Sequence, residues 1–237
     1  MKRLPRLQPS TLLAPSLVGG VASVSPPGTP QRQIGFALGD PGEPSPVPTL
    51  VIALADNSGS VTTTGGADPL ANRYAEMREA FGVVARRASR RERGAVLHFD
   101  TPTDADVPPT PLTRLGVQRL GRGLRVPHQV YGSSELLPGL RQAAELARSY
   151  ANHETTLVVL SDFALLDADP TAALLELAAF PGDVHAVVLG GLASPGLFDE
   201  RITVTSVTHE AQPGAVARAL FRSLVRHRPG SWVEETP

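Results

Sequence analysis

Side chains that carry oxygen ligands gather at three places along the chain, each beside the end of a predicted strand or the start of a predicted helix. An Asp-Asn-Ser-Gly-Ser motif follows the apolar run 49–55, and the other two places lie at the start of a predicted helix (134–147) and after the apolar run 156–160. The candidate ligands are Asp56, Ser58, Ser60, Ser134 and Asp162. Oxygen atoms without nitrogen or sulfur suit Mg²⁺ or Mn²⁺ rather than zinc. The sequence therefore predicts a divalent-cation site.

The predicted ligand set leaves room for a ligand from another molecule. Two carboxylates roughly neutralise a divalent ion, while serine hydroxyls are weak neutral donors, so the metal stays electrophilic. It can therefore accept another carboxylate from outside. The residues beside the ligands that we expect to touch a bound partner are Asn57, Gly59, Ser133 and Phe163.

Alternating strand and helix signals explain how these side chains would meet. Apolar runs predict strands over residues 49–55, 95–99, 156–160, 184–189 and 202–207, the last near a sheet edge. Helical spacing of apolar residues predicts helices over 69–85, 134–147, 171–180 and 215–226. This order is typical of an α/β fold with a doubly wound, mostly parallel central sheet and helices on both faces. Ligands bind such sheets beyond the carboxyl ends of the strands, where the candidate residues lie.

Composition excludes several other classes of protein. The 237 residues carry a formal charge of -1 and contain no cysteine, so disulfides, thiolate catalysis and cysteine metal sites are excluded. Lys2 is the only lysine, which excludes a phosphate-binding loop with its lysine. No apolar run approaches the roughly 20 residues that span a bilayer. We therefore expect no membrane insertion.

The first 48 residues differ in composition from the rest of the chain. Ten of the 23 prolines lie there, which predicts an extended Pro-rich N-terminal arm over 1–48, a domain over 49–230 and a tail over 231–237. The apolar run 34–38 fits a short edge strand as well as an apolar patch in a flexible arm. Pro15 and the Gly19-Gly20 pair interrupt the early apolar segment, which favours a cytoplasmic location over secretion.

The combination of motifs resembles the von Willebrand factor A (vWA) family and its metal-ion-dependent adhesion site (MIDAS). The resemblance covers about residues 49–228 and rests on Asp-x-Ser-x-Ser after the first strand, the Gly-x-Ser helix start and the Asp that closes a later strand. Phe99-Asp100-Thr101 also resembles the end of that family's second strand. The resemblance implies a vWA/Rossmann-like fold and direct or water-mediated metal ligation by the five candidates. It also implies an adaptor without catalysis, in which a protein partner supplies an Asp or Glu side chain to the metal. The bacterial intracellular members imply a partner such as an AAA-type ATPase, or another subunit of a multi-gene defence or stress system.

Three positions depart from the family pattern. Ser134 stands where Thr is usual, which keeps the hydroxyl group. Phe163 stands where Gly is usual, and residues 61–68 lengthen the metal loop. The last two departures predict a site with altered access.

Three alternative interpretations use the same residues or other charged groups. Asp56 and Ser58 could simply cap the following helix. A metal-dependent hydrolase could use the same two carboxylates. The arginine clusters within 86–93 and 114–125 could grip nucleic acid, although few aromatic residues accompany them and helix-terminal cations are common. We therefore favour a non-catalytic interaction module over an enzyme or a nucleic-acid-binding accessory protein.

Overall fold

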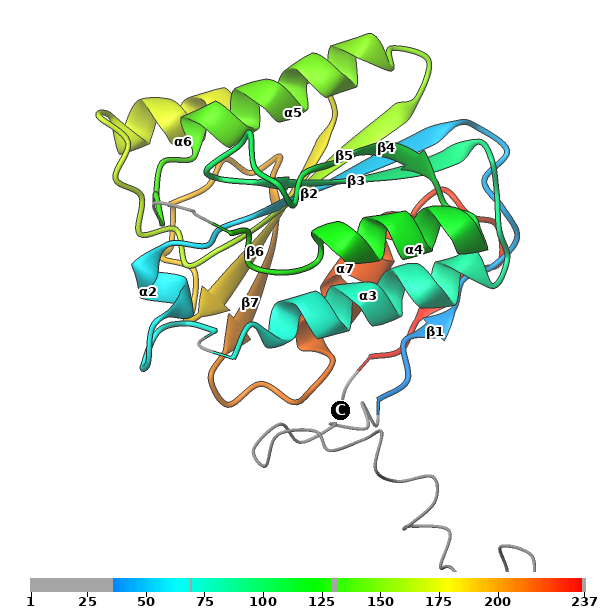
Figure 1. Cartoon of the computed structure of the whole chain (residues 1–237), viewed down its shortest axis with the longest axis horizontal. Coiled ribbons are helices and arrows are strands. Elements are labelled where there is room, and N and C mark those ends of the chain that lie inside the picture. The colour runs from blue at the N-terminus through cyan, green and yellow to red at the C-terminus, as the bar shows by residue number, and fades with distance from the viewer. Residues whose placement is uncertain (1–35, 69, 129–131, 236–237) are drawn as a thin grey trace, which may run out of the picture. The chain divides into compact units, whose positions relative to one another are not determined.

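The central element of the computed structural model is a six-stranded sheet; residues 36–68, 70–128 and 132–235 are described (Figure 1). The strand order is β4–β3–β2–β5–β6–β7. The strands are β2 (Thr49–Ala55), β3 (Glu92–His98), β4 (Val107–Pro111), β5 (Glu154–Ser161), β6 (Asp183–Gly190) and β7 (Thr203–Thr208). Neighbours are parallel except β4, which pairs antiparallel with β3 at one edge. The predicted α/β class with a mostly parallel sheet is confirmed.

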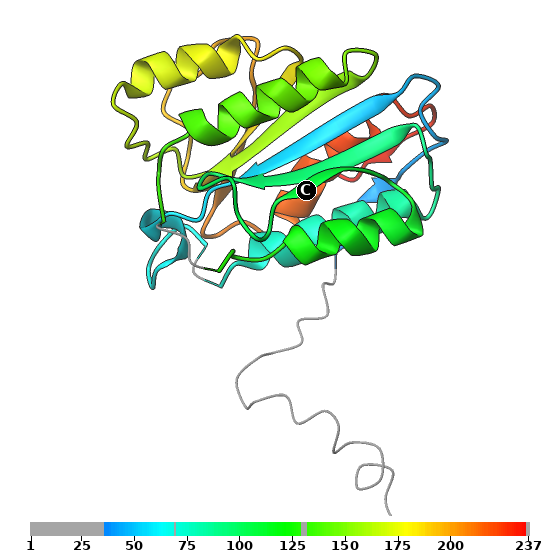
Figure 2. The same cartoon turned by 45° about the horizontal axis from the view of Figure 1, so that its top comes forward.

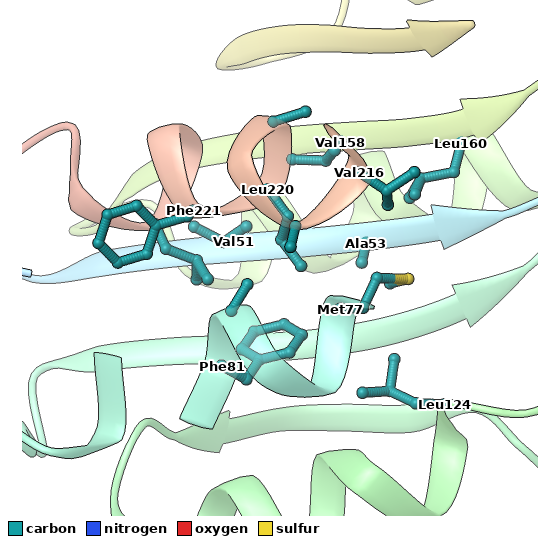
Figure 3. Packing of buried hydrophobic residues seen from close by; sticks show 14 of the residues in the cluster. Val51, Ala53, Met77, Phe81, Leu124, Val158, Leu160, Val216, Leu220 and Phe221 are labelled. Carbon is teal, nitrogen blue, oxygen red and sulfur yellow. The ribbon is translucent and has the colours of Figure 1, made fainter. Parts of the chain in front are cut away.

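The continuous apolar run of β2 is buried on both of its faces, as its pattern predicts. Alternate side chains enter opposite sides of the sheet, so Leu50, Ile52 and Leu54 belong to one core. Val51 and Ala53 belong to the other core, where they meet residues of two helices (Figure 3). The central strand therefore joins two hydrophobic layers, and its carboxyl end is fixed in position.

Helices cover both faces of the sheet (Figures 1 and 2). One face carries α3 (Asn72–Ala85), α4 (Arg114–Gly123) and α7 (Ala215–Val225), whose buried residues include Met77, Phe81 and Leu220 (Figure 3). The other face carries α5 (Leu137–Ser149) and α6 (Pro170–Ala178). A four-residue helix, α2 (Gly59–Thr62), follows β2 directly. None of the helices in the described segments is long and apolar enough to cross a membrane.

Several predicted boundaries differ from the structure. The helix predicted over 69–85 begins at Asn72, because Ala71 adopts a left-handed φ of 49° and Leu70 is 79% exposed. Between β3 and α5 the structure has two elements outside the predicted strands and helices, the edge strand β4 and the helix α4. Prolines are tolerated in β4 because it is an edge strand.

The two terminal segments of the described chain meet in a small second sheet. β1 (Gly39–Asp40) pairs antiparallel with β8 (Trp232–Val233), and the Glu234 nitrogen donates to the Leu38 carbonyl oxygen at 3.1 Å. Of the run 34–38, residues 36–38 form no strand, and residues 34–35 lie outside the described residues with the rest of the arm up to 35. The short strand thus lies at 39–40 and joins β8, not the central sheet.

A buried histidine links β6 to two neighbouring elements and makes stability pH-dependent. His185 Nδ1 lies 2.9 Å from Ser223 Oγ, and its Nε2 lies 2.8 Å from Thr205 Oγ1. Burial, aided by the charge of Arg222, lowers the pKa of His185 to about 4.

Because the unfolded chain binds this proton more tightly, stability should fall as the pH drops from about 6.5 to about 4. The expected loss from His185 is about 3 kcal/mol, measured by urea unfolding at several pH values. In His185→Gln, whose amide does not titrate in this range, this part of the pH dependence should disappear. An unchanged pH profile in that variant would refute the assignment.

Candidate metal centre

Asp56 stands at the end of β2 and is almost completely buried, with 1% of its surface exposed. Its Oδ1 accepts a hydrogen bond from the Ser58 nitrogen at 2.7 Å, and its Oδ2 accepts one from Ser161 Oγ at 2.6 Å. The Asp56 nitrogen itself donates to the Leu160 carbonyl oxygen at 2.9 Å. The carboxylate is thus held between the carboxyl ends of β2 and β5 by neutral donors.

The electrostatic surroundings of Asp56 disfavour its negative charge. Burial raises the pKa of Asp56 above its ordinary value, and the nearby charge of Asp162 acts in the same direction. Hydrogen bonds from Ser161 and Ser58 oppose this shift. A cation bound between the two aspartates would remove both the repulsion and much of the desolvation cost.

The serine hydroxyls of the motif lie together. Ser58 Oγ and Ser60 Oγ are 3.0 Å apart, with Ser58 fully buried and Ser60 exposed at the surface. Ser58 precedes α2, but its side chain makes no capping hydrogen bond. Asp68 instead accepts hydrogen bonds from the first nitrogens of α3, those of Asn72 and Arg73. The Ser58 side chain is therefore not a helix cap, whereas Asp56 does accept from the backbone nitrogen of Ser58, the residue just before α2.

The loop that carries Ser134 lies against this motif. Gly132 has a φ of 67°, and a Cβ at that position would lie 3.7 Å from both the Asn57 carbonyl oxygen and the Gly59 nitrogen. The Ser133 nitrogen donates to Asp100 Oδ1 at 3.1 Å, which ties the loop to the end of β3. Ser134 is 7% exposed, and its hydroxyl makes no hydrogen bond to the other four candidates among the described residues.

Asp162 follows β5 and is partly exposed. Its Oδ1 accepts a hydrogen bond from the Ala164 nitrogen at 3.1 Å, and its charge acts on Asp56. In the described part of the chain no three His, Asp or Glu side chains form a metal-binding group. The candidate residues comprise two carboxylates and three hydroxyls, a donor set whose chemistry fits Mg²⁺ or Mn²⁺ with further positions left to water or to another molecule.

Two of the four residues expected to touch a partner are buried. Asn57 is 3% exposed, and its Oδ1 accepts hydrogen bonds from Arg73 at 2.8 Å and from the Tyr74 hydroxyl at 2.7 Å. Phe163 is 9% exposed and has a φ of 57°. Its ring packs edge-on against that of Phe198, with 4.8 Å between the two ring centroids. These two side chains support the loops from inside and offer no partner surface.

The remaining two residues expected to touch a partner reach the surface. Gly59 is exposed and Ser133 is partly exposed.

Several supporting residues have no signal in the sequence. The guanidinium of Arg73 is buried, pairs with Asp68 at 2.6 Å and donates to the Asp56 carbonyl oxygen at 2.8 Å. Asp167 is 7% exposed and accepts from the Leu136 and Leu137 nitrogens at the start of α5. Only the tertiary fold brings these partners together, so spacing along the chain does not predict them.

No protein-family model and no curated protein sequence matches this chain. Solved structures do resemble it. The pilus adhesin SpaC from Lactobacillus rhamnosus GG aligns over 78% of this chain and 31% of its own, with a TM-score of 0.53 and 13% identity. An aerotolerance-related membrane protein from Bacteroides fragilis NCTC 9343 aligns over 75% of this chain and 98% of its own, with a TM-score of 0.51 and 10% identity.

A third similar structure is proximal thread matrix protein 1 from the mussel byssus. It aligns over 78% of this chain and 49% of its own, with a TM-score of 0.52 and 16% identity. The chain thus spans about a third of the adhesin and about half of the mussel protein. Likeness at such low identity concerns the fold alone, and the fold is a von Willebrand factor A-like α/β fold.

Proposed function

We propose that this chain is a divalent-cation-dependent protein-interaction module, an adaptor and not an enzyme. Asp56 and Asp162 would hold Mg²⁺ or Mn²⁺, directly or through water, together with hydroxyls of Ser58, Ser60 and Ser134. A carboxylate of a protein partner would complete the coordination. The partner class implied by the family resemblance, an AAA-type ATPase or another subunit of a bacterial cytoplasmic multi-gene system, belongs to the same proposal.

One observation carries the metal in this proposal. The Asp56 carboxylate is 1% exposed, yet its hydrogen-bond donors are neutral, and the charge of a second aspartate, Asp162, adds to the rise in its pKa. A buried carboxylate is costly unless a cation or strong donors compensate it. Arg73 lies close by but is directed to Asp68, Asn57 and the Asp56 carbonyl oxygen, not to the carboxylate. A bound divalent cation is the natural compensation.

The interaction part of the proposal rests on access and on fold. Ser60 and Gly59 are exposed and Asp162 is partly exposed, so a metal held there would be open to a group from outside. One protein of the same fold is named a pilus adhesin, which agrees with an interaction role.

Calorimetric titration of the metal-free chain with MgCl₂ and MnCl₂ tests the metal. We expect saturable binding near one ion per chain, weakened at least about tenfold in Asp162→Asn because one of two charged ligands is lost. Glu154→Gln is the matched control, since Glu154 is exposed at the opposite end of the same strand, β5. Absence of binding by the wild type, or equal binding by Asp162→Asn, would refute the metal site.

The adaptor and hydrolase interpretations differ in a second measurement. The adaptor predicts no turnover of p-nitrophenyl phosphate or p-nitrophenyl acetate with Mn²⁺. It also predicts that a partner retained by the immobilised chain is released by chelator and not retained by Asp162→Asn. Metal-dependent turnover that disappears in Asp56→Asn would favour the hydrolase.

A further inference from the structure

Two adjoining cavities of about 460 and 380 Å³ form a groove along α7, away from the metal centre. They share Arg222 and Val233, so they are parts of one surface. We call it the α7–β7 groove and define it by six residues. These are Thr203, Thr205, Arg218, Arg222, Arg226 and Trp232.

One side of the groove is the edge strand β7, which lacks the features that usually prevent another strand from pairing with an edge. β7 ends the sheet and pairs with β6 alone within the described residues (Figure 1). Its sequence, Thr-Val-Thr-Ser-Val-Thr, has no charge and no proline, and it is at least partly exposed along its length. Edge strands of this kind are templates for another strand unless charges, prolines or covering segments protect them. Its β-branched residues favour the extended pairing state.

A row of arginines on α7 faces the same groove. Arg218, Arg222 and Arg226 are four residues apart, which places them about 6 Å apart along the helix axis. Of these three arginines, Arg226 forms an ion pair within the described residues: its Nη1 lies 3.1 Å from Asp183 Oδ2, and both side chains are exposed. Alternate residues of an extended strand are about 6.6 Å apart. The arginine row therefore matches every second side chain of a strand beside β7.

We propose that the α7–β7 groove binds an extended segment of a partner protein that carries Asp or Glu at every second residue. The segment adds as a strand to β7, and its carboxylates pair with the arginine row. Main-chain hydrogen bonds supply affinity, and the alternating charges supply specificity and register. This site is separate from the proposed metal centre and does not depend on it.

Acidic residues of the chain itself modulate this groove. Glu234 and Glu235 line it next to Arg218 and Arg222, yet neither glutamate is within 4.0 Å of an arginine in the described residues. They repel the carboxylates of an incoming segment at one end. The double variant Glu234→Gln/Glu235→Gln should therefore bind an acidic segment more tightly than the wild type.

The chain provides its own reporter for the test, because Trp232 is its only tryptophan, lines the groove and is 56% exposed. The probe is the synthetic peptide Thr-Glu-Val-Glu-Thr-Glu-Val-Thr, titrated into the full chain in the presence of chelator. We expect a saturable change in tryptophan emission and an affinity at least about tenfold weaker for Arg218→Glu/Arg222→Glu. Arg148→Glu, exposed on α5 across the sheet, is the matched control and should bind as the wild type does.

If an arginine variant fails to fold, the proposal can still be tested with the wild-type chain and altered peptides. Replacing its glutamates by glutamines should weaken binding at least about tenfold, and N-methylation of alternate backbone nitrogens should do the same. Equal binding of the glutamine peptide would overturn the charge pairing, and equal binding of the methylated peptide would overturn strand addition. Competition by inorganic phosphate or oligo(dT) at the peptide's own concentration would assign the groove to phosphate groups instead. A dimer of the free chain that dissociates on adding peptide would show that a second copy occupies β7, which would also overturn the proposal.

Discussion

Replacing Arg228 by methionine is expected to destabilise the folded chain by about 3–5 kcal/mol, the largest effect of any single substitution considered. Arg228 and Glu92 form a two-point ion pair, with Nε to Oε1 at 2.6 Å and Nη2 to Oε2 at 2.7 Å. Their side chains are 0% and 1% exposed. Removal of the arginine leaves a buried carboxylate without its cation, which is far more costly than losing a surface pair.

The position of this pair explains what its loss would disturb. Glu92 is the first residue of β3, and its Oε1 also lies within 3.4 Å of the Ser45 nitrogen. Arg228 follows α7 and donates in addition to the Arg87 carbonyl oxygen at 2.9 Å. The pair therefore connects β3, the segment before β2 and the segment that leads to β8. Its loss should loosen the small β1–β8 sheet together with the Trp232 side of the α7–β7 groove.

Urea unfolding at neutral pH, followed by circular dichroism, measures this effect. Glu92→Gln should be strongly destabilised as well, and the double variant Glu92→Leu/Arg228→Met should recover most of the loss because no charge is then left buried. Arg201→Met removes an exposed pair with Asp199 and should change little. A loss in Arg228→Met as small as that of Arg201→Met would contradict the account.

The sequence predicts those parts of the fold that depend on local pattern. The unbroken apolar run of β2 requires burial on both faces, and the structure places its alternate residues in two separate cores. Polar residues that follow β2 and β5 must then lie at the same end of a parallel sheet. This is why the sequence alone places Asp56 and Asp162 at the same edge, beyond the paired strands β2 and β5.

Features that depend on distant partners are not visible in the sequence. Glu92 and Arg228 are 136 positions apart, and each alone looks like an ordinary surface residue. Arg73 lies in the first turn of an amphipathic helix, where charged residues are usually solvated, yet its side chain is fully buried. The sequence pattern does not predict α4, because glycines at 116, 121 and 123 weaken its helical signal, although close packing requires two of them. A Cβ at Gly116 would lie 1.8 Å from the Pro111 carbonyl oxygen, and one at Gly123 would lie 2.4 Å from that of Ala105.

Replacing Asp56 by asparagine is expected to abolish stabilisation by magnesium while leaving the metal-free chain at least as stable as the wild type at neutral pH. The pKa of Asp56 is raised, so the folded state binds this proton more tightly than the unfolded state does. The wild-type carboxylate is therefore penalised once the pH exceeds its folded pKa, and metal-free stability should rise as the pH falls through that value. An amide carries no charge to repel Asp162, and it can still accept from the Ser58 nitrogen and donate to Ser161 Oγ.

Unfolding in chelator and in excess MgCl₂ separates these two contributions. At a magnesium concentration one hundred times the dissociation constant, the wild type should gain about 2.7 kcal/mol, and the Glu154→Gln control should gain the same. Asp56→Asn should gain nothing measurable, although its metal-free stability is intact. Such a result would show that the buried aspartate is retained at a cost to the free chain, because its charge serves the ion and not the fold. Equal magnesium stabilisation of Asp56→Asn and wild type would instead place any bound ion elsewhere on the chain.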